Sequence, residues 1–281
     1  MQLTLGVTLA VLGAGFLHAS WNALLKSSPG GDALLDTATV VAGSSVWGLA
    51  VVPFAGAPAA AAWPYMAASA TLHFGYYLTL SQAYRTGDLS FAYPLMRGTA
   101  PLLVALLGVA LLRELPSVPM ALGIVLISLG IVSIAFVHHR KHPPSAAYWA
   151  FANAALIAVY TLVDASGVRA SGNAAGYVSW LIFLEGLPFL LWVFARRRKA
   201  AVRYVQSSAM RGFVGGACSL AAYGIVLWAM TRAPVAAVAA LRETSVLFAA
   251  LLGSLWLKER FGWPRLAGAV SVVLGIAVLK L

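Results

Sequence analysis

Charged residues are scarce in this sequence, and the motifs of soluble enzymes are missing. Only 10% of the 281 residues are charged, against about 25% in a typical soluble domain. The single cysteine, Cys218, excludes an internal disulfide and a zinc site built from cysteines. The sequence has no His-Glu-x-x-His, no Gly-x-Ser-x-Gly, no Walker phosphate loop and no dinucleotide fingerprint. We therefore expect no enzyme, no bound metal, no cofactor and no pump driven by ATP.

Long apolar segments fill most of the chain instead, since 61% of the residues are hydrophobic. Each segment is near 20 residues, which lets a helix cross about 30 Å of hydrocarbon, and short loops with Gly and Pro separate them. The pattern predicts an all-α integral membrane protein. Its ten transmembrane helices are expected at 3–25, 33–53, 63–85, 90–112, 116–137, 146–168, 174–195, 209–231, 235–257 and 263–280.

Part of the first half of the sequence is repeated in the second. At an offset of 145 residues, 86–131 aligns without a gap on 231–276, and 17 of the 46 positions are identical. Equivalent helices lie five crossings apart, an odd number, so they cross the membrane in opposite directions. We predict two inverted five-helix repeats, residues 1–140 and 145–281, that form one membrane unit around a central cavity.

The charges in the loops predict an orientation. One set of loops carries 13 Lys and Arg residues, whereas the other set, with the termini, carries four. The positive-inside rule places the first set in the cytoplasm and both termini outside, and we expect the bacterial cytoplasmic (inner) membrane. Six of the 13 lie at 196–211, a cluster that topology explains but that could alternatively bind anionic lipid headgroups.

The partners we expect are a small-molecule substrate and membrane lipids. The net charge of +11 is no sign of nucleic-acid binding, because the positive residues lie in loops where topology accounts for them. We expect a monomer, with a dimer as the alternative. The glycine pairs Gly123/Gly130 and Gly268/Gly275 let helices approach closely, and we expect them to serve packing within one chain.

Several motifs resemble EamA-type members of the drug/metabolite transporter superfamily. They are HASWNALLK at 18–26, AYPLMRGTAPL at 92–102, LRE at 112–114 and LKER at 257–260. The resemblance covers nearly the whole chain. It implies a cavity built mainly from helices 1, 3, 4, 6, 8 and 9, with helices 5, 7 and 10 peripheral, and export of amino acids, including aromatic ones, or other small metabolites. Many relatives are placed with cytoplasmic termini, the reverse of what loop charge predicts here.

An arginine lies inside each copy of the repeat, Arg97 in the first and Arg242 in the second. Arg97 is about 10 Å deep in its helix, where an isolated charge is expensive. A guanidinium there can bind a substrate carboxylate through two parallel hydrogen bonds, with Tyr93 one turn earlier on the same face. Alternatively, each arginine pairs with backbone carbonyls or with an internal carboxylate, for which the candidates are Glu243, Glu185 and Asp164.

Aromatic residues with polar tips share one face of the helix expected at 63–85, namely His73, Tyr76, Tyr77 and Tyr84. Such rings suit a cavity for an amphipathic solute. The alternative is the aromatic belt at the membrane interface, to which we assign Tyr84 because it lies at the helix end. His73 and Tyr77 are too central for the belt, so we place them in the substrate site.

Polar residues occupy matching positions in the first helix of each half. His18, Trp21 and Asn22 share one face, and Asn153, Tyr160 and Asp164 share a face of the helix expected at 146–168. Polar residues at corresponding positions fit a site at the repeat interface, although hydrogen bonds between helices would also explain them. The substrate site is therefore expected to include His18, Trp21, Asn22, Tyr160 and Asp164.

Two further features suggest how transport is driven and gated. Glu185 is the acid deepest in an apolar segment, which makes it a candidate for proton coupling, although Pro188 makes a structural role in a broken helix plausible. Pro94 and Pro101 interrupt the helix expected at 90–112, while Ala239 and Val246 take their places in the repeat. We expect this helix to kink and to supply the gate.

The sequence thus predicts a secondary-active or facilitative transporter that exports small metabolites, foremost amino acids including aromatic ones, by alternating access. One alternative is an exporter of drugs or of other amphipathic or cationic metabolites. A remote alternative is a membrane-embedded lipid enzyme, which would need clustered acids or a nucleophile with a base, whereas Asp164, Glu185 and Glu243 are scattered in sequence.

Overall fold

Every regular element in the described part of the chain is a helix. The computed structural model describes residues 3–26, 32–87, 89–136, 143–256 and 263–280. The helices are α1 (Leu5–Lys26), α2 (Ala33–Ala55), the 3₁₀ turn η1 (Ala60–Ala62), α3 (Trp63–Thr86), α4 (Leu89–Leu112), α5 (Val118–Phe136), α6 (Pro144–Ser171), α7 (Ala174–Ser207), α8 (Ala209–Met230), α9 (Val235–Arg242), α10 (Ser245–Trp256) and α11 (Trp263–Leu279).

Seven of these helices, α1, α2 and α4 to α8, are long and apolar enough to cross a membrane. The helix α3 is comparably long but more polar, since it carries His73, Gln82 and several tyrosines. The helices α9 and α10 are short because a break divides them, and α11 is 17 residues long. The all-helical architecture and the membrane-crossing length of most helices therefore agree with the sequence analysis.

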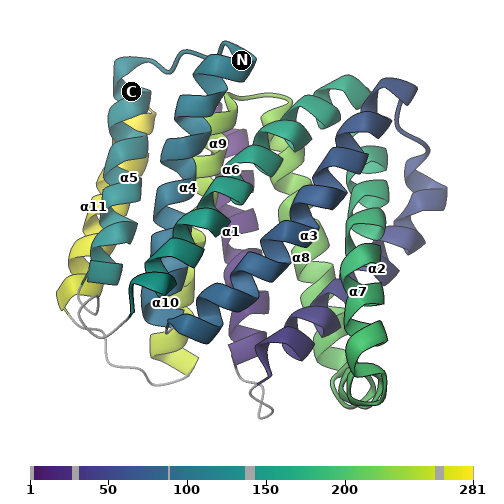
Figure 1. Ribbon diagram of the computed structural model, residues 1–281. Helices are drawn as coiled ribbons and strands as arrows, with labels where there is room; N and C mark the ends of the chain where they lie inside the picture. The colour runs from purple at the N-terminus through teal and green to yellow at the C-terminus, as the bar shows by residue number, and fades with distance from the viewer. Residues whose placement is uncertain (1–2, 27–31, 88, 137–142, 257–262, 281) are drawn as a thin grey trace.

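The helices form one bundle whose two termini lie at the same end (Figure 1). At one side of the view α5 packs on α11 and α4, and at the other side α2 packs on α7 and α8. Between them α6 packs on α3 and α4, while α1 packs on α8 and α10. The short helix α9 is buried along its whole length, as expected for a segment that is apolar on every face except for Arg242.

The helix expected at 235–257 is divided in two, which the sequence analysis did not predict. Glu243 and Thr244 form a tight turn in which Glu243 N–H donates to Ala240 O and Thr244 N–H to Leu241 O. The interruption was expected at Pro94 and Pro101, but α4 runs as one helix through both prolines. The break that is present lies in the repeat partner, at the positions aligned with Gly98 and Thr99.

The helix α7 is longer than expected, since it continues from 195 to Ser207. The continuation is not straight, because Arg197 has non-helical dihedral angles, φ −133° and ψ 30°. The run of cations at 196–199 was assigned to a loop, and it forms this bend and the start of the helical extension instead.

The glycine pairs of the repeat face each other across the contact between α5 and α11. A Cβ added to Gly123 would lie 2.7 Å from Gly275 O, and one added to Gly268 would lie 2.6 Å from Gly130 O. The expectation that these glycines serve packing within the chain is confirmed. Gly130 follows Gly123 in α5, whereas its partner Gly268 precedes Gly275 in α11. The two helices are therefore antiparallel.

An equally close contact holds α2 against α8. A Cβ on Gly43 would lie 1.9 Å from Gly212 O, and a Cβ on Gly216 would lie 2.3 Å from the carbonyl carbon of Gly43. Backbone atoms cannot yield as a flexible side chain can, so the helices would have to separate to accept any larger residue.

We predict that Gly43→Ala lowers the free energy of unfolding by about 1–3 kcal/mol or more, as overpacking of a tight contact does. The matched control is Gly13→Ala in α1, whose Cβ would meet nothing within 4 Å and which should gain up to about 1 kcal/mol from helix propensity. Thermal unfolding in detergent checks both. Equal stability of the two variants would show that α2 and α8 do not pack this closely.

Candidate functional site

A cavity of about 150 Å³, lined by both polar and apolar side chains, lies among the helices. Its wall is built from α1, α2, α3, α4, α6, α7, α8 and the last residue of α9, whereas α5 and α11 contribute nothing to it. The lining residues lie in the C-terminal halves of α1 and α3 and in the N-terminal halves of α2 and α4. On α8, however, Ala222, Tyr223 and Val226 lie in the C-terminal half, so the lining residues surround the middle of the bundle and not one end of it.

Two buried arginines and one buried glutamate form a charged trio at the cavity wall. Arg97 Nε lies 2.6 Å from Glu243 Oε2, and Arg242 Nε lies 3.4 Å from Glu243 Oε1. Glu243 is fully buried, and the two arginine residues are 4% and 5% exposed. A single carboxylate thus serves two guanidiniums, so the trio keeps a net positive charge inside the bundle.

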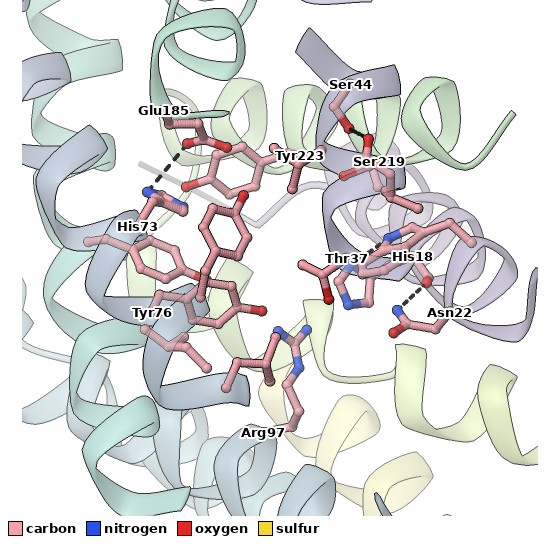
Figure 2. Close-up of a pocket in the computed structure, with 18 of the residues that line it drawn as sticks. His18, Asn22, Thr37, Ser44, His73, Tyr76, Arg97, Glu185, Ser219 and Tyr223 are labelled. Carbon is pink, nitrogen blue, oxygen red and sulfur yellow. Dashed lines mark hydrogen bonds and ion pairs between the residues drawn. The ribbon is translucent and has the colours of Figure 1, made fainter. Parts of the chain in front are cut away.

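Arg97 retains hydrogen-bonding capacity toward the cavity. Within the described chain its Nη2 atom has no hydrogen-bond partner, and Figure 2 shows the guanidinium directed into the open space. Its Cζ lies 5.9 Å from the centroid of the Tyr93 ring. Of the predicted roles for Arg97, the pairing with an internal carboxylate is present, and the cavity-facing donor leaves room for an additional anionic ligand.

The break between α9 and α10 places the trio. Arg242 is the last residue of α9, and Glu243 caps that helix, so the turn presents a cation and a carboxylate next to each other. Inside a continuous helix, adjacent residues point about 100° apart. The turn instead lets Glu243 approach Arg97 on α4 while it stays within reach of Arg242.

A second polar cluster pairs His73 of α3 with Glu185 of α7. His73 Nδ1 lies 3.3 Å from Glu185 Oε2 and 3.0 Å from Ser69 O. The imidazole lies 4.1 Å from the Tyr160 ring, measured between centroids. Rings of Tyr76, Tyr77 and Tyr223 surround the same histidine at 6.1 to 6.3 Å. Figure 2 shows this cluster on the opposite side of the open space from Arg97.

The predicted residues of α1 form a third part of the wall. The indole Nε1 of Trp21 donates to His18 Nδ1 at 3.3 Å, and the Asn22 amide donates to His18 O at 2.7 Å. All three line the cavity with Tyr93 and Tyr160. Tyr84, which was assigned to the interfacial belt, also lines the cavity, since the C-terminal half of α3 turns inward.

Asp164 lies behind the wall and does not line the cavity. It is fully buried and accepts hydrogen bonds from Tyr223 Oη at 2.5 Å and from Tyr177 Oη at 3.1 Å. Asn153 faces the cavity and donates to Tyr76 O and to Thr79 Oγ1. For both residues the hydrogen bonds between helices offered as the alternative are present, and Asp164 orients the wall residue Tyr223.

The contribution of α7 differs from what the family resemblance implied. Helix 7 was expected to be peripheral, yet Ile182 and Glu185 line the cavity, as do residues of α2. The sequence analysis also missed Ser219, Ala222, Tyr223 and Val226 of α8. Each is 146 residues after a lining residue of α3, namely His73, Tyr76, Tyr77 and Leu80. Extending the repeat to these helices would have identified them.

At the end of the bundle near the termini, a network of polar contacts joins two connections between helices to α6. Arg169 Nη1 lies 2.7 Å from Glu114 Oε1, and its Nε donates to Met230 O at 2.8 Å. The other oxygen of Glu114 accepts the N–H of Val235, the first residue of α9, at 2.8 Å. Glu114 thus caps the positive end of α9, and the network ties the α4–α5 and α8–α9 connections to α6.

Comparisons with known proteins give the family of the second half and a similar fold. Residues 144–281 match the family described as the EamA-like transporter family. No curated protein matches the sequence. A solved structure titled "Crystal structure of protein" is 17% identical, with a TM-score of 0.75, and the alignment covers 97% of this chain and 96% of that one. At this identity the likeness concerns the fold alone.

We predict that Glu243→Gln destabilises the protein far more than Glu185→Gln. The first change leaves two buried guanidiniums without a carboxylate, which should cost about 3–5 kcal/mol. The second removes a carboxylate whose ionic partner among the described residues is a histidine, which can become neutral. Thermal unfolding of both variants in the same detergent checks this. Equal losses would mean that Glu243 does not hold the two arginines in the bundle.

Proposed function

The chain belongs to the EamA-type drug/metabolite transporter superfamily, and we propose on that premise that it exports small metabolites, foremost amino acids including aromatic ones. The protein is an integral membrane protein. The observation that carries the proposal is the cavity, which combines an unsatisfied guanidinium donor, a buried carboxylate and a ring of tyrosines. These are complementary to a carboxylate, an ammonium group and an aromatic or apolar side chain.

The transporter has ten crossings in two inverted repeats, 1–140 and 145–281. Three observations support this. The helices α1, α2 and α3 of the first repeat correspond to α6, α7 and α8 of the second. The contact between α3 and α6 therefore has its counterpart in the contact between α8 and α1, and the contact between α2 and α8 has its counterpart in the contact between α7 and α3. Gly123 is equivalent to Gly268, and Gly275 is equivalent to Gly130, so the Gly123–Gly275 contact has the Gly268–Gly130 contact as its counterpart. Ser271 donates to Leu126 O, its own equivalent at an offset of 145, as happens near a two-fold axis.

Substrate reaches the cavity by alternating access, with one end of the bundle closed at a time. In this structure the Glu114–Arg169 network holds together the end near the termini. Opening the closed end requires that these contacts separate. Pro94 and Pro101 of α4, and the break between α9 and α10, are the places where the helices that carry the arginines bend.

The end of the bundle with the cationic loops faces the cytoplasm, and both termini lie outside, in the bacterial cytoplasmic (inner) membrane. The count of 13 cations against four supports this orientation. With this orientation the end opposite the termini opens to the cytoplasm in the state in which an exporter binds its substrate.

Glu185 serves proton coupling. Its position in the cavity wall supports this role, since a proton entering the cavity can reach it together with His73.

A second candidate is export of organic amines and cationic drugs. One observation favours it: Glu243 already offsets much of the charge of Arg97 and Arg242, whereas Glu185 has a histidine as its ionic partner in the described chain and lies among tyrosine rings. An ammonium group is attracted both by this carboxylate and by the faces of the rings.

Counterflow into proteoliposomes separates the two candidates. We expect saturable flux of amino acids, and we expect Arg97→Ala to weaken their binding by roughly 10- to 100-fold, because a hydrogen bond to a charged group is worth about 1.5–3 kcal/mol. The corresponding amino-acid amides, which lack the carboxylate, should be much less affected. Flux with and without a pH gradient, in the wild type and in Glu185→Gln, tests proton coupling.

Three results would contradict the substrate proposal. No saturable flux of any amino acid by folded protein removes it. Equal losses for acids and amides make Arg97 structural. Competition by amines, without competition by carboxylates, transfers the function to the second candidate.

We also predict that Glu114→Gln combined with Arg169→Gln opens the closed end. The network combines an ion pair with a helix cap, worth together about 1–2 kcal/mol, so the population open at that end should rise roughly 5- to 30-fold. A cysteine at Ser219, in a Cys218→Ser background, reports access of a membrane-impermeant maleimide from each side. The matched control is Arg113→Gln, an exposed neighbour. Unchanged labelling from the closed side would exclude the network as a gate.

A further inference from the structure

The end of α7 leaves the direction of the rest of the helix. The non-helical angles of Arg197 bend the chain, and Figure 1 shows the turns that follow, at the lower end of α7, viewed nearly along their own axis. Residues 198–207 therefore lie across the end of the bundle. We call this segment, with the first residues of α8 up to Val214, the basic shelf.

The basic shelf is fixed in place by contacts with α2. Ala201 is fully buried in a cluster with Leu35 and Ala38. Tyr204 Oη donates to Asp36 Oδ1 at 2.8 Å, and Arg197 Nη1 lies 2.6 Å from Asp32 Oδ2. These contacts determine which face of the segment turns away from the protein.

The outward face combines cations with apolar side chains. Arg198, Lys199 and Arg203 are exposed, and none of them has a carboxylate within 4 Å among the described residues. The exposed apolar members are Val202 at 40%, Met210 at 74%, Phe213 at 47% and Val214 at 42%. Nearby, Arg196 Cζ lies 5.1 Å from the centroid of the Trp192 ring, and tryptophan is typical of the interface between hydrocarbon and water.

We propose that the basic shelf binds the headgroups of anionic phospholipids. A helix that lies across the end of a membrane bundle runs in the plane of the interface, where its apolar side chains enter the acyl boundary and its cations meet headgroups. Each Lys or Arg near an anionic surface adds about the same increment of affinity. A soluble polyanion would use the cations but not the exposed apolar side chain of Val202 beside them, so a lipid is the better match.

The experiment compares retention of phosphatidylglycerol and phosphatidylcholine on the purified full chain by native mass spectrometry. The wild type should retain phosphatidylglycerol in preference. The triple variant Arg198→Gln, Lys199→Gln, Arg203→Gln should lose this preference by on the order of 100-fold, since about 1 kcal/mol per cation is roughly fivefold each. An ionic strength of about 1 M should weaken the preference for phosphatidylglycerol, because it shortens the Debye length to about 3 Å.

The matched control removes three exposed cations from the other end of the bundle, as Arg113→Gln, Arg232→Gln, Lys280→Gln, and should keep the preference. A second variant, Arg198→Lys with Arg203→Lys, retains the charge and should behave as the wild type. Equal loss in both triple variants, or no loss in either, would overturn the proposal. Displacement of the lipid by inorganic phosphate or by a short oligonucleotide at matched charge would overturn it as well, by showing a general anion surface. The readout requires no transport and is independent of the substrate.

Discussion

The structure depends on a single buried carboxylate that contacts one guanidinium from each half of the chain. Arg97 comes from α4 and Arg242 from the end of α9, and Glu243 contacts both. Charges in the interior of a membrane protein are expensive unless they are paired. The two halves therefore cannot separate at this point without exposing an unpaired charge to an apolar surrounding. The pairing and the break between α9 and α10 require each other, because the turn directs Glu243 toward α4.

The two ends of the cavity offer different electrostatic environments. The charged trio keeps an excess of positive charge, whereas the His73–Glu185 pair lies among hydroxyl groups of tyrosines. A solute with charges of opposite sign can orient itself between them, while a solute with one charge is held at one end. This polarity, more than the cavity's size, is what would discriminate among small metabolites. The surrounding close contacts of glycines, such as Gly43 against Gly212, give the wall little freedom to adapt.

Much of this arrangement could be predicted from the sequence. Apolar segments near 20 residues predicted most of the helices within a few residues, and helical periodicity correctly grouped His73 with Tyr77, and His18 with Asn22, in one cavity. What failed depends on tertiary contacts. No local signal distinguishes Arg242-Glu243-Thr244 from the middle of a helix, and the break there is stabilised by Arg97, which is 146 positions from Glu243. The prolines of α4 do not end that helix, because a helix can continue through them when neighbours satisfy the freed groups. Asp164 shared the periodicity of the cavity residues, but two tyrosines shield it.

The antiparallel contact between α5 and α11 has a consequence for the origin of the molecule. Its surface is self-complementary: Gly123 meets Gly275 as Gly268 meets Gly130, and Ser271 meets its own counterpart at position 126. Such a surface would serve equally well between two identical chains inserted in opposite orientations. Fusion of a duplicated gene would convert such a dimer into one polypeptide, after which each half would be free to diverge. The unequal trio, with a glutamate where the first half has Gly98, illustrates such divergence.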